Sequence, residues 1–392
     1  MNKKCIKDVD IKNKRVLIRV DFNVPLDDNL NITDDNRIRE SLPTIEYALK
    51  NGAKVILMSH LGRPKGEVKE KMRLTPVAHR LSELLKRPVK KPDNCIGPEV
   101  VDIVNKMQPE EVVLLENLRF HKEEEKNDSG FAKELSRLGD IFVNDAFGTC
   151  HRAHASTEGV THYLESVSGF LVKKEIEYFE KVTSSPERPF ILILGGAKVS
   201  DKVPLIENML KKVDVILIGG AMAYTFLYAK GIKIGSSRYE PEVLDLAKTI
   251  LDKAGKVELI LPKDHIACDS FDSPKKIITT ADENIKDGYL GVDIGPKTIE
   301  LFLSKIKKAG TILWNGPMGV FERDEFAEGT NRIALGIADS SAVSVVGGGD
   351  SAAAAKKFGV EERLSHVSTG GGASLEYLEG KILPGIAALS DK

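Results

Sequence analysis

The feature that most constrains the fold is a series of short, mostly apolar and β-branched runs, each closed by turn or polar residues, that alternate with helical patterns. Such runs lie at 15–22, 55–60, 112–117 and 141–146, and again at 190–196, 215–220, 259–262, 311–316 and 344–349. Apolar runs without polar alternation indicate strands that are buried on both faces. Their alternation with helices predicts an α/β fold with a parallel, doubly wound (Rossmann-like) sheet in each half of the chain.

A chain of 392 residues is too long for one ordinary hydrophobic core, so two domains are expected. We expect a first domain at 1–169 and a second at 170–380. The segment 171–182, "LVKKEIEYFEKV", has the periodicity of a helix and should connect them, acting as a hinge. The tail 381–392 should return to the first domain.

Charge and cysteine usage exclude several classes of protein. Lys and Arg number 57 against 58 Asp and Glu, so no net field attracts nucleic acid or a membrane surface. The N-terminal "MNKKCIKDVDIKNK" lacks the apolar segment of a secretory signal, and no apolar run reaches membrane-spanning length. The four cysteines are far apart without a C-x-x-C pair, which favours reduced thiols and a cytoplasmic location.

Arginines and histidines collect after the strands of the first half. In open α/β sheets, ligands bind at the carboxyl ends of the strands. The residues placed there are Asp21, Asn23, His60, Arg63, Arg119 and Arg152, with Arg37 in the segment after the first strand. Guanidinium groups bind carboxylates and phosphates through paired hydrogen bonds, so this edge is predicted to bind a small anion.

The stretch "FGTCHRAHAS" raises the alternative of a metal site, since it holds Cys150, His151, Arg152 and His154 close together. No second Cys/His pair stands at a familiar zinc spacing, and an arginine among the ligands would oppose a cation. The anion interpretation is therefore favoured. Cys150 is expected to be a small residue at a strand end.

Glycine pairs collect after the strands of the second half. They are "GGAK" at 195–198, "GGAM" at 219–222, "GGGD" at 347–350 and "GGGAS" at 370–374. Glycine lets backbone amides approach a ligand closely, and helix N-termini add a partial positive charge. Several such turns on one edge predict a site for the phosphates of a nucleotide.

Charged residues near these turns extend the nucleotide prediction. Lys198 and Lys202 are four residues apart, so both can lie on one helix face and reach phosphoryl oxygens. Asp350 would repel a bare phosphate, which makes it a candidate ligand of Mg²⁺. Glu322 could hold ribose hydroxyls. Together with the anion site, these residues point to phosphoryl transfer.

Two motifs suggest other functions. The sequence "GVDIGPKT" at 291–298 resembles a P-loop but lacks its spacing. The sequence "GGGDSA" at 347–352 fits a dinucleotide-binding pattern, which leaves an NAD-dependent dehydrogenase as an alternative. A non-catalytic sugar-phosphate-binding protein is a second alternative.

The motifs, taken in order, resemble those of phosphoglycerate kinases. They are "RVDFNVP", "SHLGRP", "NLRFH", "FGTCHRAHAS", "GGAKVSDK", "WNGPMGVFE", "GGGDSAAA" and "STGGGASLEYLEGK", which run nearly from end to end. The resemblance implies a monomeric enzyme with two domains that face a cleft. It would transfer a phosphoryl group from 1,3-bisphosphoglycerate to ADP with Mg²⁺, giving 3-phosphoglycerate and ATP in glycolysis.

The resemblance also implies a role for each matching residue. The glycerate pocket would comprise Asp21, Asn23, Arg37, His60, Arg63, Arg119 and Arg152. The nucleotide site would comprise Lys198, Lys202, Gly219, Gly220, Gly291, Glu322, Gly348, Gly349, Asp350 and Ser351, with Asp350 nearest Mg²⁺. The groups that stabilise the transferring phosphoryl group would be Arg37, Lys198, Gly371 and Gly372. Ser200 and Ser351 depart from the residues that are common in the family.

Overall fold

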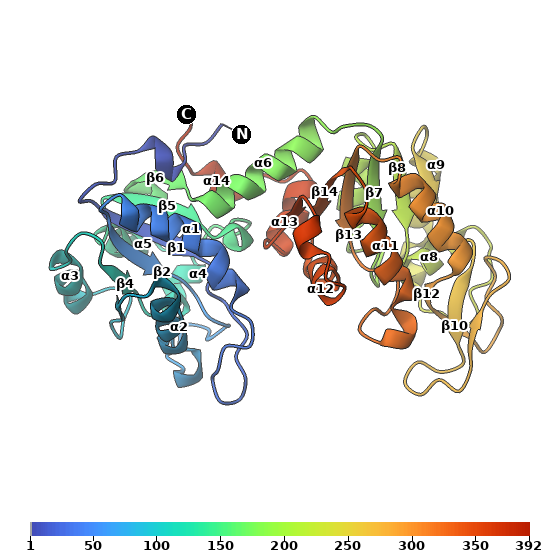
Figure 1. The fold of residues 1–392 in the computed structure, drawn as a ribbon, viewed down its shortest axis with the longest axis horizontal. Helices are drawn as coiled ribbons and strands as arrows, with labels where there is room; N and C mark the ends of the chain where they lie inside the picture. Colours follow the sequence, from blue (N-terminus) through green and yellow to red (C-terminus); the bar gives the residue numbers. More distant parts are fainter. Residues whose placement is uncertain (1) are drawn as a thin grey trace. The chain divides into compact units, whose positions relative to one another are not determined.

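The computed structural model describes residues 2–392 and divides the chain into two compact units. One unit runs to Glu177 and also includes Ile382–Lys392, and the other is Tyr178–Lys381. Each unit has a central sheet with helices packed against it (Figure 1). Among residues 2–392, no helix is both long enough and apolar enough to cross a membrane.

The first unit is built on a parallel sheet of six strands, ordered β3-β4-β2-β1-β5-β6. The strands are β1 (Arg15–Val20), β2 (Lys54–Met58), β3 (Val89–Lys90), β4 (Val112–Leu114), β5 (Ile141–Asp145) and β6 (Glu165–Ser168). The four apolar runs of this half are therefore confirmed as strands. The edge strands β3 and β6 were not predicted, because β3 has two residues and β6 reads "ESVS", in which three of the four residues are polar.

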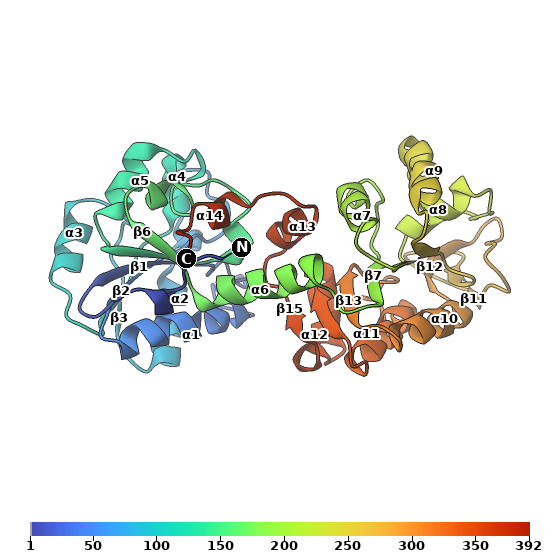
Figure 2. The same ribbon diagram turned by 90° about the horizontal axis from the view of Figure 1, so that it is seen from above.

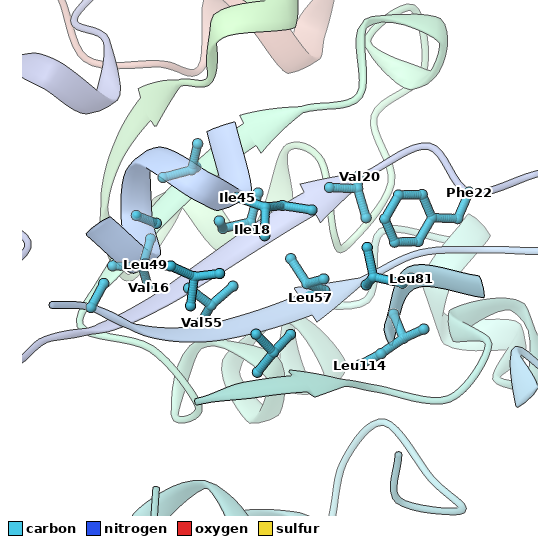
Figure 3. Close-up of a cluster of buried hydrophobic side chains, with 14 of the residues drawn as sticks. Val16, Ile18, Val20, Phe22, Ile45, Leu49, Val55, Leu57, Leu81 and Leu114 are labelled. Carbon is cyan, nitrogen blue, oxygen red and sulfur yellow. The ribbon is translucent and has the colours of Figure 1, made fainter. Parts of the chain in front are cut away.

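Helices cover both faces of this sheet. They are α1 (Asn36–Lys50), α2 (Thr75–Leu85), α3 (Pro98–Asn105), α4 (Lys122–Glu125) and α5 (Ser129–Ser136), with 3₁₀ turns η1 (Ile6–Asp8), η2 (Glu70–Met72), η3 (Leu118–Phe120), η4 (Phe147–Thr149) and η5 (Gly159–His162). Side chains alternate along β1, so Val16 and Ile18 pack with Ile45 of α1 in one core (Figure 3), while Leu17 enters a second core with α3 and α5. This two-sided burial explains the unbroken apolar runs.

The second unit repeats the plan, with a parallel sheet ordered β15-β14-β13-β7-β8-β9. Its strands are β7 (Phe190–Leu194), β8 (Val215–Ile218), β9 (Glu258–Ile260), β13 (Thr311–Asn315), β14 (Val343–Val346) and β15 (His366–Val367). The helices α10 (Pro296–Ile306), α11 (Glu328–Ala338) and α12 (Gly349–Lys357) pack on one face. Figure 2 shows α7 (Val203–Met209), α8 (Met222–Ala229) and α13 (Gly372–Leu378) on the other face, with α9 (Leu244–Lys253) beside α8.

A small antiparallel sheet in the second unit was not predicted. It comprises β10 (His265–Cys268), β11 (Ile277–Thr279) and β12 (Leu290–Ile294), in the order β11-β10-β12. These strands are short and partly exposed, so they lack the long apolar runs that marked the parallel strands. The remaining turns of this unit are η6 (Pro241–Val243), η7 (Asp324–Phe326) and η8 (Glu361–Arg363).

The connecting helix is α6 (Phe170–Ser184), and the boundary between the units falls inside it rather than at its start. Its first turn belongs to the first unit, because the Asp145 carboxylate accepts the N–H of Leu171 at 2.9 Å. Its second half belongs to the other unit, where Tyr178 stacks on His366 with ring centroids 4.7 Å apart.

The C-terminal segment, with α14 (Pro384–Ala387), packs within the first unit. The N–H of Gly385 donates to the Cys150 carbonyl at 2.9 Å, and the N–H of Ser390 donates to the Ser166 carbonyl at 2.8 Å. Backbone hydrogen bonds therefore hold the end of the chain beside β5 and β6.

Candidate active site

The strand ends of the first unit bring most of the predicted anion-binding residues to one edge. Asp21 and Asn23 follow β1, His60 and Arg63 follow β2, and Arg119 lies in η3 after β4. Arg152 follows β5 and η4. Because all strands of this sheet are parallel, their carboxyl ends lie on the same side.

Hydrogen bonds connect several of these residues. Arg37 of α1 donates to the Asp21 carboxylate. The Asn23 side-chain oxygen accepts the N–H of Gly62 at 2.8 Å, and Arg119 donates to the carbonyl of the same glycine at 3.1 Å. Asn23, which follows β1, and Arg119, which follows β4, thus both hydrogen-bond to the loop after β2. These contacts hold the loops of this edge in place.

Several positive groups lie close together at this edge. Burial lowers the pKa of the Arg119 guanidinium and Arg152 acts in the same direction, while Glu125, Glu124 and Asp21 oppose them. Burial also holds the pKa of His60 well below its usual value, with Arg19, Arg119 and Arg37 acting in the same direction. An anion would relieve this repulsion between cations, so the edge is suited to a carboxylate or phosphate.

Two predicted arginines are exposed. Arg152 donates from Nε to His151 at 3.1 Å. Arg63 has no hydrogen bond or ion pair with any other residue in 2–392, which leaves its guanidinium open to a ligand. The sequence alone could not separate these exposed cations from the buried Arg119.

The Cys150 and His154 side chains are both buried, and their contacts are those of a protein core. The Asn144 amide lies 3.5 Å from the Cys150 sulfur, and burial raises the pKa of this thiol to about 12. Burial lowers the pKa of His154 to about 4, with Arg119 and Arg19 acting in the same direction. Within residues 2–392, no group of three or more His, Cys, Asp or Glu side chains could hold a metal ion.

The second unit has a pocket of about 200 Å³ at the ends of its strands. Four predicted residues line it, namely Gly220, Gly291, Glu322 and Asp350. The other lining residues are Gly196, Ala197, Ala221, Tyr224, Val292, Pro317, Gly319 and Val320. Walls made largely of backbone and small side chains leave room for a flat ligand such as a nucleobase. Gly219 lies beside the pocket, where a Cβ atom would meet the Met318 sulfur at 2.6 Å.

The predicted lysines differ in their surroundings. Lys202 donates from Nζ to the side-chain oxygen of Asn315, a buried residue at the end of β13. Burial lowers the pKa of Lys202, while the nearby Asp201 and Asp350 raise it. Lys198 is exposed. The structure thus places Lys202 close to Asp350, as a site for a metal-bound phosphate would need.

Two glycine-rich turns begin helices on this side of the sheet. Gly348 caps α12 with φ of 97°, a conformation that favours glycine, and Gly349, Asp350 and Ser351 form its first turn. Ser351 is buried and its hydroxyl accepts the N–H of Gly316 at 2.5 Å. Gly371 caps α13, which begins at Gly372. Free N–H groups at helix starts are anion donors, which fits the prediction of phosphate-binding turns.

The P-loop resemblance at 291–298 has a structural explanation. Gly291 lies in β12, and Gly295 caps α10. The buried carboxylate of Asp264 accepts the N–H groups of Lys297 and Thr298 at 3.0 and 2.8 Å. The N–H groups at the start of α10 that would bind a phosphate in a P-loop therefore bind the Asp264 carboxylate instead.

Three residues of the candidate site were missed in the sequence. Asn315 contacts Lys202 and donates to the Gly347 carbonyl at 2.6 Å, although only Glu322 was taken from its motif "WNGPMGVFE". Tyr224 lines the pocket, but in the sequence it looks like an ordinary core residue of a helix. Arg19 is buried beside His60, and an arginine inside an apolar strand was a visible signal.

A cation-rich strand edge in one parallel unit, and a glycine-walled pocket with a lysine and a carboxylate in the other, define the class of the protein, a phosphotransferase. The family model described as phosphoglycerate kinase matches residues 6–381. The chain belongs to the phosphoglycerate kinase family.

Relatives and solved structures agree over the whole chain. The phosphoglycerate kinase of Chlorobium phaeobacteroides is 55% identical over 397 residues, and that of Koribacter versatilis is 55% identical over 405 residues, each covering 100% of both chains. The structure of phosphoglycerate kinase from Coxiella burnetii matches with a TM-score of 0.90 and 41% identity, covering 98% of both chains. That from Pyrococcus horikoshii matches with a TM-score of 0.85 and 36% identity, covering 99% of this chain and 98% of the other.

The family fixes the reaction as reversible phosphoryl transfer from 1,3-bisphosphoglycerate to ADP, giving 3-phosphoglycerate and ATP. The resemblance stated from the sequence motifs is therefore confirmed, and so is the expected fold class. The alternatives of a dehydrogenase and of a non-catalytic binding protein are both displaced by this result.

Proposed function

We propose that the first unit binds the glycerate substrate through its strand-end cations. The residues assigned to it are Asp21, Asn23, Arg37, His60, Arg63, Arg119 and Arg152. The observation that supports this most is that Arg19, Arg119 and Arg37, together with burial, lower the pKa of His60, so several cations converge at this edge and an anionic ligand would relieve their repulsion. A substrate with a carboxyl and a phosphate group offers two anions to such an edge.

The nucleotide belongs in the pocket of the second unit. Gly219, Gly220, Gly291 and Glu322 would surround the base and ribose, and Lys198, Lys202 and the start of α12 (Gly348, Gly349, Asp350 and Ser351) would bind the phosphates. The support for this is a pocket of about 200 Å³ that joins Gly291 and Glu322 to Asp350. The base would lie against glycine and small side chains, with the phosphates toward the helix start.

Asp350 is the residue assigned to Mg²⁺. Its exposed carboxylate is a hard oxygen ligand in the first turn of α12, and it lines the pocket. One protein carboxylate together with substrate phosphates is an ordinary set of ligands for Mg²⁺. The ion would neutralise phosphate charge during transfer.

The transfer itself needs positioning and charge stabilisation more than covalent chemistry. The nucleophile from 3-phosphoglycerate is a carboxylate, which has no proton to lose, so no general base is required. Arg37, Lys198 and the N–H groups near Gly371 and Gly372 are assigned to the transferring phosphoryl group. A direct, in-line transfer without a phosphoenzyme follows from these roles.

The residues assigned to the two substrates lie in different units, so the units must approach each other for chemistry. Reacting atoms have to come within about 3–3.5 Å and water has to be excluded. Helix α6 spans the boundary between the units and is the segment about which they would hinge. We further propose that the protein is a monomer and that it acts in the cytoplasm. The second part is supported by four unpaired, buried cysteine thiols.

A coupled assay for ATP formation from 1,3-bisphosphoglycerate and ADP tests the activity. Calorimetric titration of 3-phosphoglycerate and of MgADP into the Arg63→Ala and Lys202→Met enzymes tests the division of substrates. Arg63→Ala should weaken only the glycerate and Lys202→Met only the nucleotide. The reverse pattern would overturn the assignment of ligands to units.

A further inference from the structure

Arg19 is a fully buried arginine inside a strand of the first unit, with 1% of its surface exposed. It lies in β1, one residue before the strand ends, among the apolar residues Leu17, Ile18 and Val20. A buried guanidinium is costly unless its N–H groups all find acceptors. Its partners therefore indicate what keeps it there.

Three partners accept hydrogen bonds from Arg19. Nε donates to the Ser156 hydroxyl at 2.9 Å, Nη1 donates to the Val20 carbonyl, and Nη2 lies 3.0 Å from Nδ1 of His60. A guanidinium has donors and no acceptor. Nδ1 of His60 must therefore be the acceptor, which leaves the ring neutral with its proton on Nε2.

The proton-bearing nitrogen of His60 has no partner in residues 2–392, although the side chain is only 5% exposed. This nitrogen is not among the enclosed side-chain atoms of the described residues that lack a partner, so it is open to solvent at the strand edge. A ligand oxygen placed there would accept its hydrogen bond. His60 follows β2 at the cation-rich edge, where an anion is expected.

On the side away from His60, Arg19 is held by Ser156 and, through it, by Glu124. The Ser156 hydroxyl, which accepts from Arg19, donates to Oε1 of Glu124 at 2.6 Å, and the N–H of Ser156 donates to Oε2 at 3.0 Å. Glu124 is fully buried, and its charge supports that of Arg19. A chain of hydrogen bonds thus runs from a buried carboxylate through a hydroxyl and a guanidinium to an imidazole.

Four charged or titratable groups near His60 disfavour its protonation. They are Arg19 on β1, Arg37 on α1, Arg119 in η3 and His154 in the loop after η4. Burial of the ring acts in the same direction, and together they keep the pKa of His60 well below its usual value. Geometry and electrostatics therefore agree that this ring is neutral.

We propose that Arg19, Ser156 and Glu124 are positioning residues that fix His60 as the neutral Nε2–H tautomer, so that it donates one directed hydrogen bond to the glycerate anion. The proposal rests on the assignment of His60 to the glycerate pocket made above. A fixed neutral donor keeps the same hydrogen bond while the pH varies, whereas an ordinary histidine would change charge in this range. Arg19 and Glu124 act through His60 and need not touch the substrate.

The tautomer can be observed directly by nitrogen NMR of the intact protein with ¹⁵N-labelled histidine. The chain has eight histidines, and a His60→Gln variant identifies the His60 resonances. We expect Nε2 to carry the proton and Nδ1 to be the acceptor without substrate, unchanged between about pH 5.5 and about pH 8.5. A proton on Nδ1, or titration in that range, would overturn the proposal.

The functional part is tested with Ser156→Ala, which removes the hydroxyl that joins Arg19 to Glu124. The KM for 3-phosphoglycerate should rise about tenfold while that for MgATP is unchanged, and the His60 resonances should shift. The matched control is Ser136→Ala, which deletes a hydroxyl of the same unit that donates to the Lys133 carbonyl in α5. It should change neither quantity.

Two results would contradict the inference in different ways. If Ser156→Ala leaves both the resonances and the KM for 3-phosphoglycerate unchanged, the hydrogen-bond chain does not position His60. If His60→Gln leaves that KM unchanged, the assignment of His60 to the glycerate pocket is wrong, and the proposal fails through its premise. The NMR result on the unaltered protein separates the two cases.

Discussion

Arg37 donates a hydrogen bond to the carboxylate of Asp21, so two residues assigned to the same substrate already contact each other. Arg37 lies in the first turn of α1, and Asp21 directly follows β1. The Arg37 side chain remains 40% exposed while that of Asp21 is 11% exposed. The carboxylate therefore orients a guanidinium whose other N–H groups are open to solvent and to a ligand.

Arg37→Ala should lower turnover much more than it weakens binding of 3-phosphoglycerate. Loss of one donor to a transition-state charge typically lowers the rate by about 10²–10³. Steady-state kinetics and calorimetry measure the two effects. The control is Arg39→Ala on the same helix, where Arg39 is exposed and pairs with Asp35. Turnover of Arg37→Ala within a few-fold of the control would end the assignment.

Asp350→Asn should raise the Mg²⁺ concentration needed for activity and weaken MgATP binding, because it removes an anionic oxygen ligand. Affinity for 3-phosphoglycerate should not change. Calorimetry of ATP at low and high Mg²⁺ measures the effect, with the exposed Asp252→Asn as control. Equal affinity of Asp350→Asn and Asp252→Asn for MgATP at low Mg²⁺ would show that Asp350 is not near the metal.

Gly291→Ala should weaken nucleotide binding at least about tenfold, because the new Cβ would lie 2.0 Å from the Tyr224 hydroxyl at the wall of the pocket. Either the tyrosine or the strand β12 must move, and both change the pocket. Fluorescent-nucleotide titration measures this. Gly130→Ala in α5, whose Cβ would meet only Asp128 at 3.1 Å, serves as control. Normal nucleotide affinity in Gly291→Ala would exclude Gly291 from the site.

His265 should make the second unit less stable in acid. Burial lowers its pKa to about 4, Nε2 lies 3.2 Å from the Glu283 carbonyl, and the buried Nδ1 has no partner among residues 2–392. The unfolded chain, with a pKa near 6.5, binds the proton first as the pH falls. The contribution of the neutral His265 to the free energy of unfolding is therefore complete above about pH 6.5 and is lost as the pH falls toward 4. The loss is about 2 kcal/mol between pH 7 and pH 5.

The His265→Gln enzyme should lose this pH dependence. The single tryptophan, Trp314, is buried in β13 of the same unit, so its fluorescence during urea unfolding reports on the right part of the chain. His79→Gln, at an exposed histidine of α2, is the control and should keep the wild-type slope. Parallel stability curves for wild type and His265→Gln would contradict the prediction.

Solution scattering should reveal closure of the two units. We expect little change in radius of gyration with 3-phosphoglycerate or MgADP alone and a clear decrease with both, since only the pair offers ligand surface to both units. Phosphate at equal ionic strength is the control for charge screening. The same radius in all four states would leave the hinge proposal without support.

The sequence by itself determined the strands and the chemistry at their ends. A parallel strand buried on both faces needs an unbroken apolar run, and such runs marked nine of the strands of the two parallel sheets. Parallel strands end on one side of a sheet, so Arg119 and Arg152 could be expected near each other without coordinates. The glycine turns before α12 and α13 were equally visible, because helix starts after strands leave a local signal.

Only the tertiary structure decided which of these groups bond to each other. Lys202 and Asn315 are 113 residues apart, and Arg19 and His60 are 41 apart. No local pattern carries such pairings, because they depend on strand order and on the loops that each core holds in place. Whether a side chain is buried also depends on its neighbours in space. Arg63 and Arg119 both follow strands in the sequence, yet Arg63 is exposed and Arg119 is buried, so only Arg119 has to satisfy its charge inside the protein.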